Sequence, residues 1–431
     1  MQMFRTVARA AGTAILLASS SMLAHAVDVS FLTHWSPETV AKLEAAGAAY
    51  TKAHPDVTLT VRAVPFGDLL TTLRSSGGGA GGATIAGIYD AWLPDLVKDG
   101  LVAPVPEAIA ADTKANWPAG VIGAATIGGT LYGIPNEIDV YALNYNKKLF
   151  EAAGITEAPK TWDEFLVAAE KLTDKSKGQQ GFGMINSWAA GVLHPFASLL
   201  VSNGGDLVVD GKPALDSKQA AETFALYEKL IKSGFTDPAM ATADANTTGP
   251  FLDSFVSGKT GMIIMANWWE SALKGGMGDK FADIATAPIP VGPSGDKARS
   301  ISYSWMTVVN AKASPDEQKA AFDFLAWLNG PTSGENGASA MGDILMSMGI
   351  LPSRTSDGAA FAARLASDPF LKGYTETLAN AKGFPVVLGG QEFSESLQKT
   401  LEAIQFGQIS AADAQKTAQA DAVEILTRAA K

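Results

Sequence analysis

Near the start of the chain, two β-rich segments flank one well-marked helix, and this arrangement constrains the fold more than any other feature. VDVSFLTHW (27–35) alternates apolar and polar residues, and VTLTVRAV (57–64) is rich in β-branched residues. Between them, SPE (36–38) supplies an N-cap residue, a proline at the first helical position and an early acid. A strand–helix–strand unit is typical of a parallel sheet. The sequence therefore predicts an α/β fold.

The first 26 residues differ from the rest of the chain. Arg5 and Arg9 precede the short apolar run AGTAILLA, and the segment closes with AHA (24–26). A basic region, a short apolar region and an A-x-A site describe a secretory signal peptide. The apolar run is far shorter than the ~20 residues that span a bilayer. We therefore expect residues 1–26 to be a cleaved signal peptide and the protein to be exported to the periplasm.

Size, charge and cysteine content narrow the class of protein. Removal of residues 1–26 leaves 405 of the 431 residues, which is more than one hydrophobic core usually supports, so two domains are expected. The chain contains no cysteine, which excludes disulfides, zinc–thiolate sites and a cysteine nucleophile. Loss of Arg5 and Arg9 changes the net charge from -11 to -13. An acidic chain with scattered lysines is not expected to bind nucleic acid.

The stretch YGIPNEIDVYALNYN (132–146) reads as an extended segment with one unusual face. Side chains alternate along a strand, so Glu137, Asp139 and Tyr141 share a face, opposite an apolar one. Three interpretations of this face stay open: a solvated surface, the acid pair of a glycosidase, or one wall of a ligand site.

Several aromatic residues follow or end predicted strands. In an open α/β sheet, the ends of strands converge on the edge where ligands bind. Flat aromatic faces beside carboxylates suit a sugar, whose C–H faces stack on indole rings while its hydroxyl groups form hydrogen bonds. On strand-end position we select His34, Trp35, Trp188, Trp268, Trp269 and Trp305, and we add Asp90, which follows the strand ATIAGIY.

Signatures of catalysis are mostly missing from the sequence. His34, His54 and His194 are widely spaced, and neither HExxH nor GxSxG occurs. We therefore expect no catalytic residue, no metal and no cofactor. The pair of acids in the segment 132–146 leaves a secreted glycoside hydrolase as a less favoured alternative.

An ordered set of segments resembles the extracellular solute-binding proteins of ABC transporters, in particular the sugar-binding group that includes maltose-binding protein. The most specific match is YGIPNEIDVYALNYNKKLFEAAGI followed by PKTWDEF. HPDVTLTVRAVPFGDL, FVSGKTGMIIMANWW and the segment from APIP to SWMTVVNAKASPDEQKAAFDFLAWL complete the set. The resemblance covers essentially the whole chain after the expected signal peptide.

This resemblance implies a two-lobed periplasmic binding protein fold whose discontinuous lobes are joined by hinge strands. The implied lobes are residues 27–140 plus 288–330 and residues 141–287 plus 331–431. Hinges are implied near Asp139–Leu143, Ala285–Pro290 and Gly330–Gly334. By position, the implied cleft residues are Trp35, Asp90, Glu137, Asp139, Tyr141, Trp268, Trp269, Trp305 and Arg354.

The expected function is therefore capture of a carbohydrate and its delivery to the permease subunits of an ABC importer, without catalysis and as a monomer. Closure about the hinges would trap the ligand. A second alternative is a binding protein for a charged sugar derivative or polyol, phosphorylated or sulfonated, in which Arg354 would hold the anion.

Overall fold

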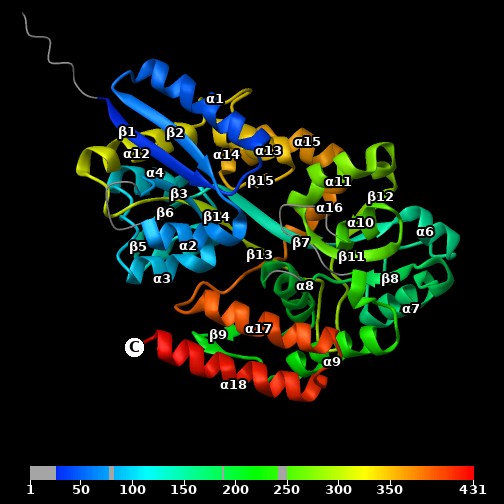
Figure 1. Ribbon diagram of the computed structural model, residues 1–431. Helices are drawn as coiled ribbons and strands as arrows, with labels where there is room; N and C mark the ends of the chain where they lie inside the picture. Colours follow the sequence, from blue (N-terminus) through cyan, green and yellow to red (C-terminus); the bar gives the residue numbers. More distant parts are fainter. Residues whose placement is uncertain (1–25, 77–81, 187–188, 241–249) are drawn as a thin grey trace, which may run out of the picture.

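The computed structural model describes residues 26–76, 82–186, 189–240 and 250–431. The chain forms two lobes, each built on its own β-sheet with helices packed around it (Figure 1). This arrangement confirms the predicted α/β, two-lobed fold. The expected signal peptide lies outside the described residues, apart from Ala26.

The first sheet has five strands in the order β2-β1-β3-β14-β6. Strand β1 is parallel to β2 and β3, while β14 is antiparallel to β3 and β6. Their bounds are β1 Val27–Thr33, β2 Val57–Ala63, β3 Ile85–Tyr89, β6 Gly133–Pro135 and β14 Trp305–Val309.

Helix α1 (Pro37–Ala53) joins β1 to β2 and confirms the predicted strand–helix–strand start. The Ser36 hydroxyl caps the helix by accepting a hydrogen bond from the Thr39 N–H at 3.4 Å, and a proline follows the cap. Leu43, Gly47 and Tyr50 recur at intervals of three or four residues, so they share one buried face. A side chain at Gly47 would collide with Leu59 of β2, so glycine permits close packing of helix and sheet.

The second sheet is organised around the ten-residue strand β7 (Glu137–Asn146). Strands β15, β13, β11 and β12 all pair with β7 in antiparallel fashion, at its residues 137–138, 139–140, 141–145 and 143–146 respectively. Strand β8 adds to β11, and β16 adds to β13. Their bounds are β8 Gln180–Gly183, β11 Thr260–Ala266, β12 Ile284–Ala287, β13 Ile301–Tyr303, β15 Leu351–Pro352 and β16 Lys382–Gly383.

The chain changes sheet at Asn136, between β6 and β7, and again at Ser304, between β13 and β14. These positions differ from the expected hinges at 139–143 and 285–290. Residues 141–145 pair with β11, and residues 284–287 pair with the end of β7, so both expected segments belong to the ladder of the second sheet.

Two hydrogen bonds tie the two crossings together. The Ser304 hydroxyl donates to the Glu137 carbonyl at 2.8 Å, and the Asn136 N–H donates to the Trp305 carbonyl at 2.9 Å. The crossing segments therefore lie side by side between the lobes.

Helices cover both sheets (Figure 1). Helix α12 packs on β1 and β14 of the first sheet, whereas α17 packs on α8, α9 and α18. The remaining α-helices are α2 Phe66–Ser76, α3 Leu93–Lys98, α4 Glu107–Asn116, α5 Ala119–Ala124, α6 Lys147–Ala152, α7 Trp162–Leu172, α8 Ala189–Ser202, α9 Lys218–Lys232, α10 Pro250–Val256, α11 Glu270–Met277, α12 Pro315–Leu328, α13 Ala340–Met348, α14 Thr355–Ala360, α15 Ala362–Ser367, α16 Pro369–Leu378, α17 Gly390–Gln405 and α18 Ala411–Ala429.

Short 3-10 helices and two-residue ribbons complete the elements: η1 Asp90–Trp92, η2 Lys175–Lys177, η3 Pro238–Met240, η4 Asn267–Trp269, η5 Gly278–Asp283, β4 Thr126–Ile127, β5 Thr130–Leu131, β9 Val208–Val209 and β10 Lys212–Pro213.

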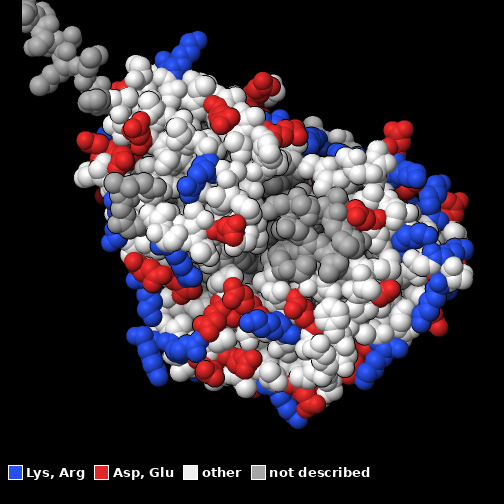
Figure 2. Space-filling model, viewed as in Figure 1, with Lys and Arg blue, Asp and Glu red and all other residues white. Residues whose placement is uncertain are grey.

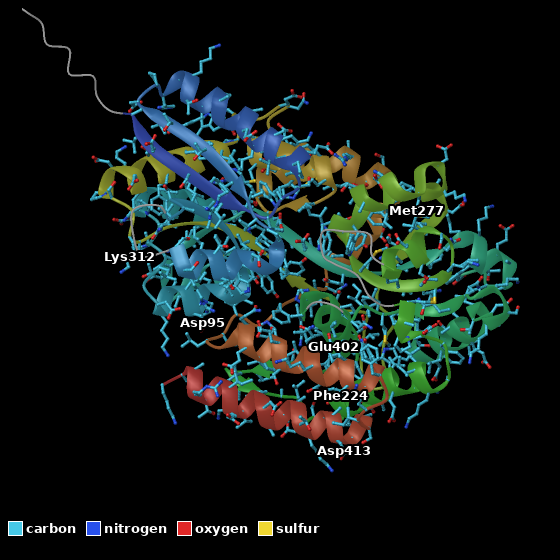
Figure 3. The ribbon with its side chains drawn as sticks, viewed as in Figure 1. Asp95, Phe224, Met277, Lys312, Glu402 and Asp413 are labelled. Atoms are coloured by element: carbon cyan, nitrogen blue, oxygen red, sulfur yellow. The ribbon has the colours of Figure 1, made fainter. Side chains whose placement is uncertain are left out.

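Two side chains labelled in Figure 3 illustrate the contacts that hold neighbouring helices together. The Asp95 carboxylate of α3 accepts a hydrogen bond from the Gly389 N–H at 2.9 Å, which joins α3 to the start of α17. Phe224 of α9 packs against Phe196 of α8, with ring centroids 4.7 Å apart. Across the described parts of the chain, no helix combines the length and apolarity needed to cross a membrane.

Candidate ligand-binding site

A cavity of about 980 Å³ lies between the two lobes. The first lobe contributes the segments that follow β1 and β2, together with the end of β3 and the start of β14. The second lobe contributes β7, the end of β13, η4 and the end of α13. The lining residues are His34, Trp35, Ser36, Pro37, Glu38, Thr39, Lys42, Ala63, Val64, Pro65, Phe66, Gly67, Tyr89, Glu137, Asp139, Tyr141, Ala190, Trp268, Trp269, Ser271, Ala272, Tyr303, Trp305, Ser347, Met348 and Ile350.

Most of the residues selected from the sequence meet at this cavity. The eight that line it are His34, Trp35, Glu137, Asp139, Tyr141, Trp268, Trp269 and Trp305. They meet because the strands of both sheets end at the same boundary. Trp188 lies outside the described residues.

Stacked aromatic side chains form much of the wall on both sides. In the first lobe, the His34 and Trp305 rings lie 4.2 Å apart between centroids. In the second lobe, Trp268 and Trp269 lie 4.2 Å apart, and the Trp268 indole N–H donates to the Tyr303 hydroxyl at 2.7 Å. The wall therefore offers flat apolar faces with polar edges.

Three aromatic residues of the wall were missed by the sequence analysis: Phe66, Tyr89 and Tyr303. Tyr89 and Tyr303 are the last residues of β3 and β13, and Phe66 begins α2 soon after β2. All three therefore lie at or soon after the end of a strand, which is the same sequence signal that marks the tryptophans.

Glu137 and Asp139 are buried carboxyl groups at the cavity wall, 3 % and 1 % exposed. Their side chains hydrogen-bond to each other, which requires a shared proton. Burial raises the pKa of Asp139 to about 7, although hydrogen bonds with Glu137, Asn267 and Tyr303 lower it. Burial, and then the negative charge of Asp139, raise the pKa of Glu137 well above its usual range.

The two histidines near the cavity are held in the neutral form. Burial lowers the pKa of His34 to about 4 and that of His194 to about 3. The His194 ring lies between two tyrosine hydroxyls, Tyr89 at 2.9 Å and Tyr141 at 3.3 Å. This chain of polar atoms joins β3 of the first lobe to α8 and β7 of the second.

Asp90 does not line the cavity, contrary to the sequence prediction. Its carboxylate instead accepts a hydrogen bond from the Ser304 N–H at 2.8 Å, and its own N–H donates to the Ser304 carbonyl at 3.0 Å. Burial raises the pKa of Asp90 to about 7, despite hydrogen bonds from Ser304 and Ala91 that lower it. Asp90 therefore holds the second crossing rather than a ligand.

Arg354 also lies away from the cavity, and its prediction as a cleft residue is wrong in this structure. Its guanidinium group donates to the Asn329 carbonyl at 2.8 Å and lies 4.8 Å from the centre of the Trp117 ring. The long side chain is buried by these contacts and by the nearby Asp112 carboxylate, at 3.6 Å. Arg354 therefore stabilises the fold.

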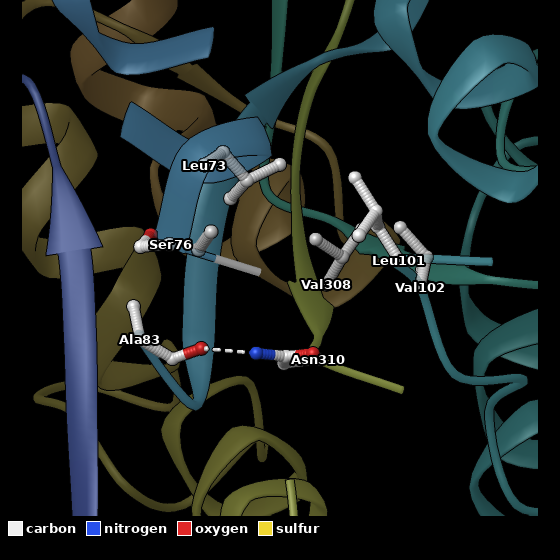
Figure 4. Close-up of a pocket in the computed structure, with 8 residues that line it drawn as sticks. Leu73, Ser76, Ala83, Leu101, Val102, Val308 and Asn310 are labelled. Carbon is white, nitrogen blue, oxygen red and sulfur yellow. Dashed lines mark hydrogen bonds between the residues drawn. The ribbon is translucent and has the colours of Figure 1, made fainter. Parts of the chain in front are cut away.

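A second, much smaller pocket opens between α2 and strands β3 and β14 of the first sheet (Figure 4). Its volume is about 10 Å³, which is room for a single water molecule at most. The Asn310 amide donates to the Ala83 carbonyl at 3.2 Å across this pocket. The pocket is a packing gap and not a ligand site.

On the face drawn in Figure 2, acidic and basic side chains are interspersed. Among the described residues, no cluster of three or more histidine and acidic side chains is arranged to hold a metal ion.

Residues 35–335 match the model of the bacterial extracellular solute-binding protein family. The chain belongs to this family. The prediction of a solute-binding protein is therefore confirmed. The matched region includes the crossings and most of the cavity wall of this solute-binding protein.

Three proteins that are similar to this chain differ in their identity and coverage. A binding protein of Brucella abortus (strain 2308) is 26% identical over 424 residues, which are 97% of each chain. The maltotriose-binding protein of Pyrococcus abyssi is 26% identical over 242 residues, covering 55% of this chain and 48% of the relative. The GacH receptor of Streptomyces glaucescens, solved without ligand and with acarbose, has a TM-score of 0.79 at 22% identity and covers 93% of this chain and 99% of its own.

Proposed function

We propose that this solute-binding protein captures a carbohydrate in the interlobe cavity and delivers it to an ABC importer. The observation that carries the proposal is the convergence of stacked aromatic rings and buried polar groups from both lobes on one cavity of about 980 Å³. A large, mostly preformed cavity with a few converging polar groups is typical of a small-molecule site.

The chemistry of the wall supports a sugar. Trp35 and Trp305 on one side, and Trp268 and Trp269 on the other, offer faces for the C–H surfaces of pyranose rings. Between them, the carboxyl groups of β7 and the tyrosine hydroxyls provide acceptors and donors for ring hydroxyls. The name of the Pyrococcus relative, a maltotriose-binding protein, supports the same class of ligand.

Closure of the lobes would trap this ligand. We propose a first lobe built on the first sheet and a second built on the second. The lobes expected from the sequence, 27–140 plus 288–330 and 141–287 plus 331–431, differ in placing residues 137–140 and strand β13 in the first lobe. The crossings at Asn136 and Ser304 are the proposed hinges. A third hinge at Gly330–Gly334, directly after α12, stays a proposal.

We propose binding without turnover. A retaining glycosidase holds its two carboxyl groups ~5 Å apart and an inverting one holds them further apart, so that a substrate bond or a water fits between them. Glu137 and Asp139 are neighbours on one face of the single strand β7, so both lie on the same side of the cavity and do not flank a bound sugar from opposite sides. Sustained release of a hydrolysis product from a purified sample would contradict this proposal.

The alternative ligand, a phosphorylated or sulfonated polyol, loses its main support. Arg354 was the residue expected to hold the anion, and it is buried against Trp117 instead. The wall carries the carboxyl groups of Glu137 and Asp139, which would repel an anion.

We further propose that the protein works as a monomer in the periplasm and docks on the permease subunits of its importer. The expected signal peptide and the membership in an extracellular family support export. Docking would follow closure, because the two lobes then present one continuous surface.

A thermal-shift screen of mono-, di- and oligosaccharides tests the function, because a ligand that binds only the folded state raises Tm. We expect at least one carbohydrate to raise Tm, and sulfated or phosphorylated polyols to have no effect. A shift with charged polyols alone would overturn the carbohydrate proposal.

A further inference from the structure

The carboxyl pair at the cavity wall has no positive partner. One oxygen of Glu137 and one of Asp139 are buried without any hydrogen-bond partner, and no ion pair with either residue occurs among the described residues. The wall contains one lysine, Lys42, which is exposed. His34 is neutral because burial lowers its pKa to about 4.

Glu270, a buried carboxylate nearby, differs from this pair because it has positively charged partners. Glu270 directly follows Trp269 and is 2 % exposed, yet it does not line the cavity. It is paired with Lys274 at 2.6 Å and with Arg364 at 3.6 Å. Buried carboxylates are normally paired in this way, because an unpaired buried charge is costly.

Asp90 is also buried with one unpartnered oxygen and no ion pair, but its other oxygen accepts a hydrogen bond from the Ser304 N–H and it does not line the cavity. Glu137 and Asp139 are the unpaired buried carboxyl groups at the cavity wall, where a ligand can supply the positive partner.

Other groups around the pair also favour a cation. The titratable side chains that face it are Tyr141 on β7, Tyr303 on β13 and Asp90 after β3. Burial raises the pKa of both tyrosines well above the usual range, so they are neutral and present oxygen atoms. The tryptophan faces add the attraction of a cation to the π-electrons of an aromatic ring.

We propose that the ligand is an amino sugar, whose ammonium group binds between Glu137 and Asp139 while its ring stacks on the tryptophans. This inference rests on the proposed carbohydrate function and narrows it. Ammonium donates three hydrogen bonds and carries the missing positive charge, so it satisfies both unpartnered oxygens at once. A neutral sugar hydroxyl satisfies one acceptor and leaves the charge unbalanced.

Binding of an ammonium group has a signature that a neutral sugar lacks. The free pair shares a proton, and the ammonium replaces that proton as the positive partner. A proton then leaves to the buffer, so binding of the amine releases protons at a pH below the raised pKa values of the pair. Calorimetry in two buffers of different ionisation enthalpy measures the number of protons released.

The test compares sugars that differ in a single substituent, titrated into the full chain. One series is the β-1,4-linked glucosamine dimer, its di-N-acetylated form and cellobiose, and the second is glucosamine, N-acetylglucosamine and glucose. We expect the amine to bind at least tenfold more tightly than its matched partners, with release of a proton. Asp139→Asn and Glu137→Gln should remove the preference and the proton release.

The control variant is Asp90→Asn. It removes a buried carboxyl whose pKa is also about 7 but which does not line the cavity, and the asparagine oxygen can still accept from the Ser304 N–H. This variant should keep the preference for the amine. Loss of the preference in Asp90→Asn as well would assign it to long-range charge and overturn direct contact.

The two proposals fail in different ways. Neutral sugars that bind as tightly as the amines, in these series or in the wider screen, would overturn the amino-sugar inference and leave carbohydrate binding intact. If no sugar of either kind binds, both proposals are overturned.

Discussion

Burial of Asp90 should make the stability of the ligand-free protein depend on pH in a way that one substitution can isolate. The pKa of this carboxyl is about 7 in the folded protein and 3.8 in an unperturbed chain, so the folded state holds the proton more tightly. A raised acid pKa contributes stability that is present at low pH and is lost as the pH rises through the folded pKa. Asp90 should therefore contribute a loss of stability between pH 5 and pH 8.

The magnitude follows from these two pKa values. At pH 5 the folded state holds the Asp90 proton almost completely, whereas the unfolded state has mostly released it. At pH 8 both states have lost it. Integration over this range gives a loss of roughly 2–3 kcal/mol in the free energy of unfolding from Asp90 alone.

Asp90→Asn removes this contribution while keeping an acceptor for the Ser304 N–H. Urea unfolding of the wild type and the variant at pH 5, 6, 7 and 8 measures the difference. The wild type should lose about 2–3 kcal/mol more than the variant between pH 5 and pH 8. Asp163→Asn, at an exposed carboxyl of α7, should follow the wild-type profile. Parallel profiles for Asp90→Asn and the wild type would show that the pKa of Asp90 is not raised by burial.

Three further substitutions probe the site and its support. Trp268→Ala should weaken ligand binding by roughly tenfold to a hundredfold in calorimetry, because it removes a stacking face, while Trp327→Ala on α12 should leave the affinity unchanged; equal affinities for both variants would place Trp268 outside the site. Arg354→Ala should cost roughly 2–4 kcal/mol of stability in urea without changing the affinity, and an affinity loss would return Arg354 to the cleft. Gly349→Ala should cost about 2–3 kcal/mol in the same urea assay, because φ is +83° and a Cβ there would collide with Glu270; a neutral result would contradict this packing.

The parts of the fold that were predictable from the sequence depend on local rules. The helix at residues 37–53 could be placed because its cap, its proline and its apolar spacing are all written in consecutive residues. The shared face of Glu137, Asp139 and Tyr141 could be placed because alternation along a strand needs no distant information. The tryptophans of the cavity followed from the same logic applied at strand ends.

The errors concern residues whose position depends on distant partners. Asp90 and Arg354 are isolated polar residues in the sequence, and nothing local reveals that Ser304 and Trp117 will surround them. The crossings at Asn136 and Ser304 lie outside the hinge segments expected from the sequence for the same reason. The length of β7 is set by pairing with strands that are remote in sequence, which hydrophobic pattern alone does not reveal.

The bonds between the two crossings limit how the lobes can move. Two independent linkers would allow one lobe to rotate about several axes and to twist against the other. Because Ser304 is bonded to Glu137, and Asn136 to Trp305, we expect the two proposed hinges to move together and to bend more easily than they twist. Opening and closing then approach a single degree of freedom, so the two walls meet in the same register each time. Closure on a ligand then costs little conformational entropy, because the bonded crossings already restrict how the lobes can align.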